Sequence, residues 1–330
     1  MRFASEVVSF RSARSFGAKI LAAVVAIVAL VYTIIEAPES GWTSAQTITG
    51  FALSLAALLV FIRVELAAPH PMLDVALFRD LRFSAAAGAI TVSYFALFGF
   101  IFLVTQFFQF VRDDSPLGTG LRFLPVAGSI AVASLIGGFL APRLGSKLVV
   151  TAGMVLLASS FLWISTMSAD ASYATTIVGQ MVLMGAGLGL ISTPATESIM
   201  QVLPPARAGV GSAVNDATRE FGGTLGVAVI GSIFSSVYAA KIASTAGDLL
   251  DGSQVRAAEE SVGVGRALAD VVPGLGPLVD EAFMDGFGTA CLIVGILCLA
   301  GAVFTLVALP GNRATAANDP VEAEGQGAEV

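Results

Sequence analysis

The sequence predicts an all-α polytopic membrane protein, and its composition gives the first reason. Of the 330 residues, 56% are hydrophobic and only 12% are charged, whereas a soluble domain averages about 25% charged residues. The apolar residues gather in long runs, and a membrane-spanning helix needs about 20 of them. Glycine is also frequent, at 35 residues, as expected where membrane helices pack through small side chains.

Eight apolar runs are long enough to be transmembrane helices, and polar turns separate them. The expected spans cover residues 18–35, 48–64, 83–110, 120–140, 148–167, 175–196, 209–238 and 287–309. The polar segment 1–16 lacks the apolar core of a cleavable signal peptide, so we expect the first helix to be retained. Residues 239–286 are expected to form a long polar loop, and the segment 310–330 has the composition of a disordered tail.

The distribution of Lys and Arg predicts the orientation, because short cytoplasmic loops carry an excess of basic residues. If the N-terminus is cytoplasmic, the short outer segments hold only Arg112 and Arg122. The inner segments then hold Arg2, Arg11, Arg14, Lys19, Arg63, Arg79, Arg82, Arg143, Lys147, Arg207 and Arg313. An even number of spans places the C-terminus on the same side, so both termini are expected in the cytoplasm, and the loop 239–286 is expected outside.

The span 209–238 carries charges in its first half, where lipid makes them costly. Its polar residues are Asn215, Asp216, Arg219 and Glu220. Residues three or four apart share a helix face, so Asp216 is the expected partner of Arg219. This group is either a gating or coupling site inside a transporter or a structural ion pair near the cytoplasmic mouth. Gly222 and Gly226 form a small-xxx-small pair, which predicts the close approach of another helix.

Four further polar residues lie near the ends of spans. Gln106 and Gln109, near the outer end of the third span, are expected to hydrogen-bond either a substrate or a neighbouring helix. Glu36 and Glu65 are expected to be solvated. The stretch GGFLAPRLGSK, residues 137–147, has by composition alone the character of an ordinary basic cytoplasmic loop.

Several function classes find no support in the residues. No basic tract suggests nucleic-acid binding. His70 is the only histidine, so neither a metal site nor another cofactor site is expected. Cys291 and Cys298 lie inside an apolar run and are expected to be buried small hydrophobes. An integral membrane enzyme is disfavoured because no nucleophile–base pair appears.

Four stretches carry a family resemblance: Gly41–Trp42, QFFQFVRDDSPLGTGLRFLP (106–125), GGFLAPRLGSK (137–147) and GVGSAVNDATREFGGTLGVAVIG (209–231). They resemble the major facilitator superfamily, and more closely its fourteen-span drug:proton antiporter branch. The third stretch is similar to the second copy of the superfamily's loop motif, matched here at Gly138, Arg143, Gly145 and Lys147. The acidic position of that motif is Pro142 in this sequence, so a gating salt bridge through that position is absent.

The resemblance implies an architecture for the eight spans. Residues 17–66 would be two linker helices, and 83–309 the C-terminal six-helix half of a transporter with two such halves. The motifs of the N-terminal half are not found in this sequence. That half, from the same gene or from a separate chain, is therefore an expected partner, together with a small-molecule substrate, protons and the lipid bilayer.

The function implied by the resemblance is proton-driven efflux of small amphipathic drugs or metabolites by alternating access in the cell membrane. Such a protein is a secondary transporter and not an enzyme. The alternative is a non-transporting truncated remnant, or a partner subunit of a split transporter. The sequence pattern does not decide between a transporter, a remnant and a partner subunit.

Overall fold

The apolar runs of the chain form long helices in the computed structural model. A helix satisfies the backbone hydrogen-bonding groups of a segment within that segment, which lipid requires. The structure describes residues 2–68, 71, 75–204 and 207–309, with side chains from residue 17 onward. The tail 310–330 and His70 lie outside the described residues.

Eight helices in the described part of the chain are long and apolar enough to cross a membrane. This finding confirms the predicted fold class and span count. The elements in chain order are α1 (Arg2–Ser40), α2 (Ala45–Ala67), the 3₁₀ helix η1 (Val75–Arg79), α3 (Leu81–Gln106), the π-helix η2 (Phe107–Val111), α4 (Pro116–Arg122), α5 (Leu124–Leu144), α6 (Ser146–Ile164), the π-helix η3 (Tyr173–Ile177), α7 (Val178–Gln201), α8 (Ala208–Thr245), α9 (Gly252–Glu260), α10 (Val262–Ala269) and α11 (Leu275–Ala308).

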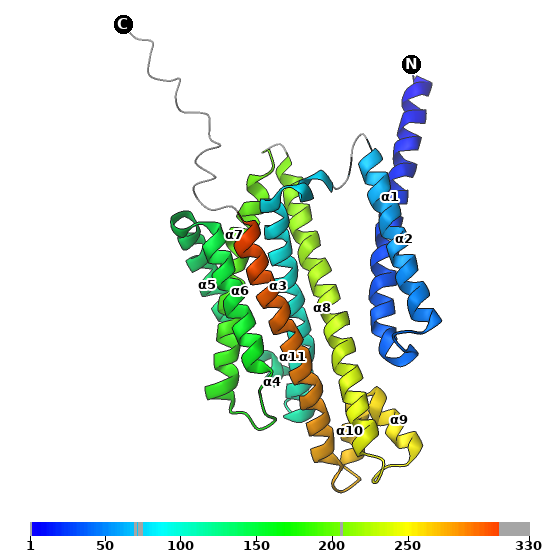
Figure 1. Cartoon of the computed structure of the whole chain (residues 1–330), viewed down its shortest axis with the longest axis vertical. Helices are drawn as coiled ribbons and strands as arrows, with labels where there is room; N and C mark the ends of the chain where they lie inside the picture. Colours follow the sequence, from blue (N-terminus) through cyan, green and yellow to red (C-terminus); the bar gives the residue numbers. More distant parts are fainter. Residues whose placement is uncertain (1, 69–70, 72–74, 205–206, 310–330) are drawn as a thin grey trace.

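The helices form a bundle with a separate pair at its side (Figure 1). Helices α1 and α2 pack on each other, and α1 also contacts α8. Within the bundle, α8 packs against α3 and α11, while α7 packs against α5 and α6. The start of α1 and the end of α11 lie at one end of the molecule, and α9 and α10 lie at the opposite end (Figure 1). We call these the termini end and the α9–α10 end.

Three helices extend beyond their predicted limits. Helix α1 begins at Arg2, so the segment 1–16 is not separate from the first span. The expected polar loop 239–286 is largely helical, because α8 continues to Thr245, α11 begins at Leu275, and α9 and α10 lie between them. Ion pairs hold the extended ends of α8 and α11 together: Lys241 Nζ of α8 lies 2.7 Å from Glu281 Oε1 and 3.0 Å from Asp285 Oδ2 of α11.

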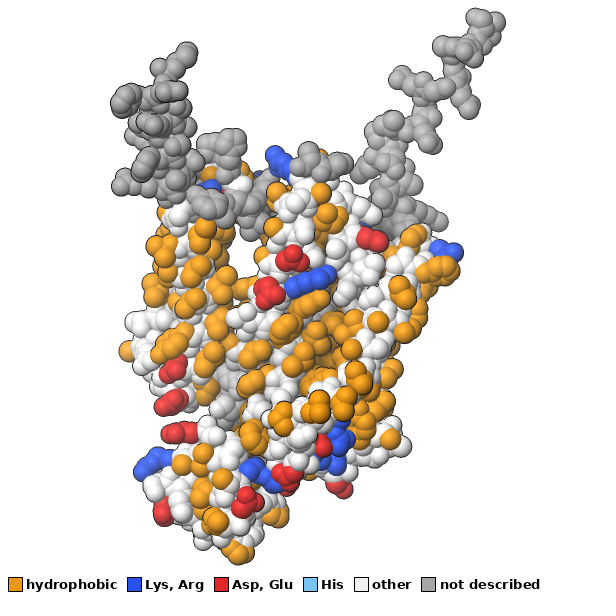
Figure 2. Space-filling model, turned by 180° about the vertical axis from the view of Figure 1, so that it is seen from behind, with side chains coloured by type: hydrophobic (Ala, Val, Ile, Leu, Met, Phe, Trp, Pro, Cys, Tyr) orange, Lys and Arg blue, Asp and Glu red, His pale blue; other side chains and the backbone are white. Residues whose placement is uncertain are grey.

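The core is apolar and rich in aromatic rings. Phe107, Phe283, Phe287, Phe234 and Tyr238 form a chain of ring contacts with centroids 5.0–6.4 Å apart. Cys291 and Cys298 are buried and free, as predicted. Outside, Figure 2 shows a broad hydrophobic band with charged side chains gathered toward the α9–α10 end, as expected for a bundle surrounded by lipid.

Candidate functional site

Helix α8 lies against α3 along a stripe of glycines. A Cβ atom on Gly222 would clash with the backbone of Thr91, and one on Gly226 with the backbone of Phe95. On Gly223 it would meet the ring of Phe98 at 3.1 Å. Only glycine permits this approach, so the predicted small-xxx-small contact is confirmed and its partner helix is α3.

The close approach brings the polar residues of α8 to two neighbouring helices. Arg219 Nη2 donates a hydrogen bond to Thr196 Oγ1 of α7 at 3.2 Å, and Thr196 Oγ1 donates to Asn215 Oδ1 at 3.2 Å. The Arg219 guanidinium also lies 5.1 Å from the ring centroid of Tyr94 on α3. We call these four residues the Arg219 cluster. It joins α3, α7 and α8 near the termini end.

Asp216 is not the partner of Arg219, contrary to the prediction. Within the described residues Arg219 makes no ion pair, and its buried Nε has no hydrogen-bond partner. The helix geometry explains the difference, because positions 215 and 219 share one face and positions 216 and 220 the next. Asn215 is buried against α7, so Arg219 follows it inward, while Asp216 and Glu220 are exposed.

The exposed face of α8 therefore presents two carboxylates that no described helix covers. Asp216 and Glu220 are one turn apart, and intramembrane acids usually face a protein interior or a water-filled cavity. Sequence reasoning identified both acids but missed Tyr94 and Thr196. A tyrosine and a threonine inside apolar spans were the available signals.

The helix pair α1–α2 approaches the first turns of α8. A cavity of about 290 Å³ lies there, lined by Lys19, Phe61, Val210 and Ala217 among others. Glu65 was expected to be solvated, but it is buried, and Lys19 Nζ lies 3.4 Å from its Oε2. A buried charge needs such a partner. Glu36 is half-buried.

The predicted loop motif forms the tight junction between α5 and α6. Gly145 has φ +88°, a left-handed conformation that favours glycine. A Cβ on Gly138 would lie 3.4 Å from Thr193 of α7. The guanidinium of Arg143 lies over the Phe139 ring, 3.4 Å from its centroid, and Lys147 is half-buried. Within the described residues, no hydrogen bond or ion pair joins this motif to the Arg219 cluster.

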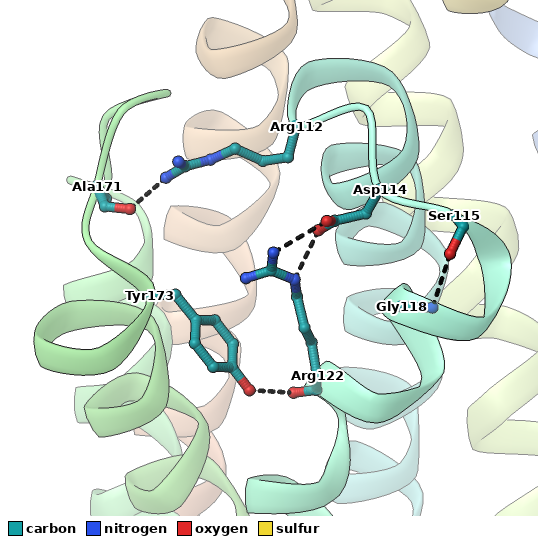
Figure 3. Close-up of polar contacts among 7 residues, drawn as sticks. All are labelled: Arg112, Asp114, Ser115, Gly118, Arg122, Ala171 and Tyr173. Atoms are coloured by element: carbon teal, nitrogen blue, oxygen red, sulfur yellow. Dashed lines mark hydrogen bonds and ion pairs between the residues drawn. The ribbon is translucent and has the colours of Figure 1, made fainter.

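A second charged cluster closes the α9–α10 end (Figure 3). Arg122 Nε lies 2.6 Å from Asp114 Oδ2, and its Nη2 donates to Asp114 Oδ1 at 2.9 Å. Tyr173 donates its hydroxyl hydrogen to the Arg122 carbonyl oxygen at 3.1 Å, and Arg112 donates to the Ala171 carbonyl oxygen. We call Arg112, Asp114, Arg122 and Tyr173 the Arg122 clamp. It fixes the starts of α4, α5 and α7 to the end of α3.

The two predicted glutamines lie near this clamp. Gln106 ends α3 and lines a cavity shared with α8, α9 and α10, and Gln109 is half-buried in η2. Neither side chain has a hydrogen bond to a described residue, so the expected bond to a neighbouring helix is not found there. Among the described residues, no group of three or more His, Cys, Asp or Glu is arranged so that it could hold a metal ion.

Curated relatives of this chain are named for drug resistance, efflux or export. It is 38% identical over 213 residues to "Multidrug resistance protein Stp" of Mycobacterium tuberculosis, covering 64% of this chain and 39% of that protein. It is 31% identical over 284 residues to "Multidrug efflux pump LfrA" of Mycolicibacterium smegmatis, covering 84% and 56%. For the "Tetracenomycin C resistance and export protein" of Streptomyces glaucescens, identity is 30% over 298 residues, covering 86% and 55%. The chain thus spans about half the length of the curated relatives it matches.

The helical fold matches that of a solved transporter. A bacterial homolog of the human lysosomal transporter Spinster, in an inward-facing and unoccupied conformation, superimposes with a TM-score of 0.54 at 16% identity, covering 80% of this chain and 58% of that one. The family model "Major Facilitator Superfamily" matches residues 3–227. This multi-pass membrane chain belongs to the Major Facilitator Superfamily.

Proposed function

We propose that this chain supplies one wall of a proton-driven efflux pump for small amphipathic compounds. The names of the relatives Stp and LfrA, which refer to multidrug resistance and efflux, support the substrate class. The wall would be the six-helix part from α3 to α11, with α1 and α2 beside it. The second wall would come from another six-helix half, on the same chain or on a separate one.

The uncovered acids of α8 are the observation that carries this proposal. Asp216 and Glu220 are exposed on a membrane-spanning helix, where an unpartnered charge costs roughly 2.5–3.5 kcal/mol on the insertion scale. A second half with a polar or wet surface against α8 removes that cost. Substrate paths of such transporters lie where two repeats meet, so this face of α8 would border the path.

Arg219 and Asp216 are assigned to an inner gate and not to substrate binding. Both residues lie in the first half of α8, close to the termini end, which we propose is cytoplasmic. Arginine keeps its charge at every physiological pH, so the Arg219 guanidinium remains available to a carboxylate of the second half. Gln106 and Gln109, at the opposite end, are proposed to border the substrate path.

The proposal is tested in the assembled pump. Asp216→Asn and Arg219→Ala should slow proton-driven export of every substrate about equally, because a gate acts on all of them. Arg256→Ala, an exposed arginine on α9, is the matched control and should leave export unchanged. A change in the ranking of substrates at an unchanged overall rate would assign the pair to the binding site.

Two further measurements test the architecture. Expressed alone in a drug-susceptible host, the chain should insert in the membrane but give no resistance, and proton-dependent efflux under these conditions would refute the one-wall proposal.

Reporter fusions at residue 330 and within 246–274 should report opposite sides of the membrane. The same side for both would overturn the proposed orientation.

A further inference from the structure

Helices α1 and α2 form a hairpin whose surface carries a groove of about 670 Å³. The turn of this hairpin, residues 41–44, lies at the end of the pair that is away from the start of the chain (Figure 1). The groove follows both helices, from Glu36 and Gln46 near the turn to Val24 and Leu53 farther from it. We call it the Glu36 groove.

Close packing fixes the shape of this groove. A Cβ atom on Gly50 would clash with the hydroxyl of Thr33, so glycine allows α2 to approach α1 there. Ser54 Oγ donates a hydrogen bond to the Ala26 carbonyl oxygen at 2.8 Å, and both residues are buried. The two helices are therefore held at a defined distance, and the groove between them is a built feature of the pair.

The length of the groove matches one leaflet of a bilayer. Glu36 and Val24 are twelve positions apart on α1, which corresponds to about 18 Å at 1.5 Å per residue. One leaflet contributes about 15 Å, half of the hydrocarbon thickness of about 30 Å. Trp42, in the turn, is exposed, and tryptophan is enriched at the membrane–water interface. The groove thus runs from the headgroup level toward the middle of the membrane.

The end of the groove near the turn is polar. The hydroxyl groups of Thr47 and Thr49 donate hydrogen bonds to the carbonyl oxygens of Gly41 and Ala45, at 2.9 and 2.8 Å. The side chains of Glu36 and Gln46, by contrast, make no hydrogen bond or ion pair with a described residue. A carboxylate and an amide therefore remain for a ligand at this end.

The other end of the groove is apolar. Its lining consists of the small and branched side chains Val24, Val25, Val28, Ala29 and Leu53. A ligand that fits both ends has a polar head at the membrane surface and an apolar chain that reaches toward the bilayer centre. A phospholipid has this shape, and it takes this orientation in the leaflet on the side of the hairpin turn.

The charge of the groove selects the headgroup. Glu36 is half-buried on a membrane-spanning helix, where a charge without a partner is costly. No Lys or Arg is among the described residues that line the groove, so an anionic headgroup gains no counter-charge there. A primary ammonium group carries the opposite charge and N–H donors, and charge-assisted hydrogen bonds to a carboxylate are strong. A choline group has no N–H to donate.

We propose that the Glu36 groove binds one phospholipid with a primary amine in its headgroup. The ammonium group donates to the Glu36 carboxylate, and the Gln46 amide donates to a phosphate oxygen. One acyl chain lies along Val24, Val28 and Leu53. Helices α1 and α2 line the whole groove, so this proposal goes beyond the proposed pump and its test does not depend on transport.

The test compares three phospholipids with the same acyl chains: phosphatidylethanolamine, phosphatidylcholine and phosphatidylglycerol. Purified full chain in detergent is mixed with each lipid, and native mass spectrometry measures how much lipid stays bound. One phosphatidylethanolamine molecule per chain should be retained more tightly than either of the other lipids. Equal retention of the three lipids, or a preference for phosphatidylglycerol, would overturn the proposal.

A charge variant locates the headgroup. Glu36→Gln should weaken phosphatidylethanolamine binding about fivefold, as for the loss of a partly exposed ion pair, and should remove the preference over phosphatidylcholine. Asp248→Asn removes the same charge from an exposed position between α8 and α9, outside the groove, and it should bind like the wild type. Unchanged binding by folded Glu36→Gln, or equal weakening by both variants, would contradict the assignment.

A groove-filling variant gives an independent readout. Ala29→Phe keeps every charge and occupies the path of the acyl chain, so it should abolish tight retention of phosphatidylethanolamine. Ile35→Phe adds a ring at an exposed position of α1 outside the groove and is its control. Thermal unfolding establishes that each variant is folded. Undiminished binding by Ala29→Phe would overturn the proposal, and so would a lipid-free dimer that this variant dissociates, because a second copy would then fill the groove.

Discussion

Two arginines near opposite ends of the bundle are satisfied in different ways. Arg122 meets both oxygens of Asp114 at 2.6 and 2.9 Å and lies between the rings of Phe108 and Tyr173, 5.3 and 4.8 Å from their centroids. Arg219 has one hydroxyl partner, Thr196, and one ring, Tyr94. Its charge has no carboxylate partner within the described residues, although Asp216 and Glu220 are close in sequence.

The difference shows which of the two charges finds its counter-charge within this chain. Arg122 lies beside a carboxylate of the same chain, and such charge-assisted pairs are strong, although the buried Nε of Arg112 in the same clamp has no hydrogen-bond partner among the described residues. The Arg219 cluster leaves a cation on one face of α8 and two anions on the next. This open arrangement is what a contact surface of a larger transporter requires, and the following variants test the contrast.

The largest effect is expected where both ends depend on the same helix contact. Gly226→Leu places a side chain in the backbone of Phe95 and should separate α8 from α3, which carries Tyr94 of the Arg219 cluster and continues into η2 with Phe108 of the Arg122 site. Overpacking of this kind costs about 3 kcal/mol. We expect loss of monodisperse protein in size-exclusion chromatography. Gly209→Leu, at a position with open space around it, is the control, and equal damage by both would contradict the role of the glycine stripe.

The next effect separates the two arginines. Arg122→Leu leaves the partly buried carboxylate of Asp114 without its partner, which should lower the free energy of unfolding by about 2 kcal/mol. Thermal unfolding in detergent measures this loss. The double variant Arg122→Leu/Asp114→Leu should recover part of it, because no carboxylate then remains unpaired. An additive double variant would show that the two side chains do not interact.

A smaller effect is expected at the other arginine. Arg219→Leu removes one hydrogen bond to a neutral hydroxyl and one ring contact, worth about 0.5–1 kcal/mol. The same unfolding measurement should rank it below Arg122→Leu. Asp216→Asn should leave the unfolding temperature of the isolated chain unchanged. A larger loss at Arg219 than at Arg122 would mean that Arg219 is already fully paired within this chain.

Hydropathy was sufficient to predict much of the fold. The eight spans follow from the length of the apolar runs, and the contact along Gly222 and Gly226 follows from the spacing of small residues. The helical connection 239–286 was not predicted, because α9 and α10 are too short for a periodic signal. They are stabilised by end caps and by distant pairs such as Arg266 with Asp113, which local sequence does not reveal.

The candidate site was predicted only in part, for a geometric reason. Sequence spacing identified Asn215, Asp216, Arg219 and Glu220 as one group, but it could not tell which face of α8 meets α7. That choice depends on the buried position of Asn215 beside Thr196. The burial of Glu65 was missed in the same way, because its partner Lys19 lies 46 positions away on another helix.

The smallest effect concerns the cap of α9, the helix that presents Glu259 and Glu260. Asp251 Oδ1 accepts hydrogen bonds from the Ser253 hydroxyl at 2.6 Å and from the amides of Ser253 and Gln254, each at 2.9 Å. These bonds, the Ser253 hydroxyl foremost, hold the pKa of Asp251 below its ordinary value. A carboxyl group with a lowered pKa in the folded state stabilises above its unfolded pKa of about 3.9. Its contribution is lost as the pH falls through the folded value.

Acidification below about pH 4 should therefore loosen α9 first, since 3.9 is the ordinary pKa of an aspartate. Hydrogen-exchange protection factors of residues 255–258, corrected for intrinsic exchange, should fall between pH 5 and pH 3 in the wild type. In Asp251→Asn, whose amide oxygen also caps a helix but does not titrate, protection should stay level over this range. Asp251→Ala should lower protection at both pH values. Equal acid sensitivity in the wild type and Asp251→Asn would place the titrating group elsewhere, and would contradict the role of the Asp251 cap.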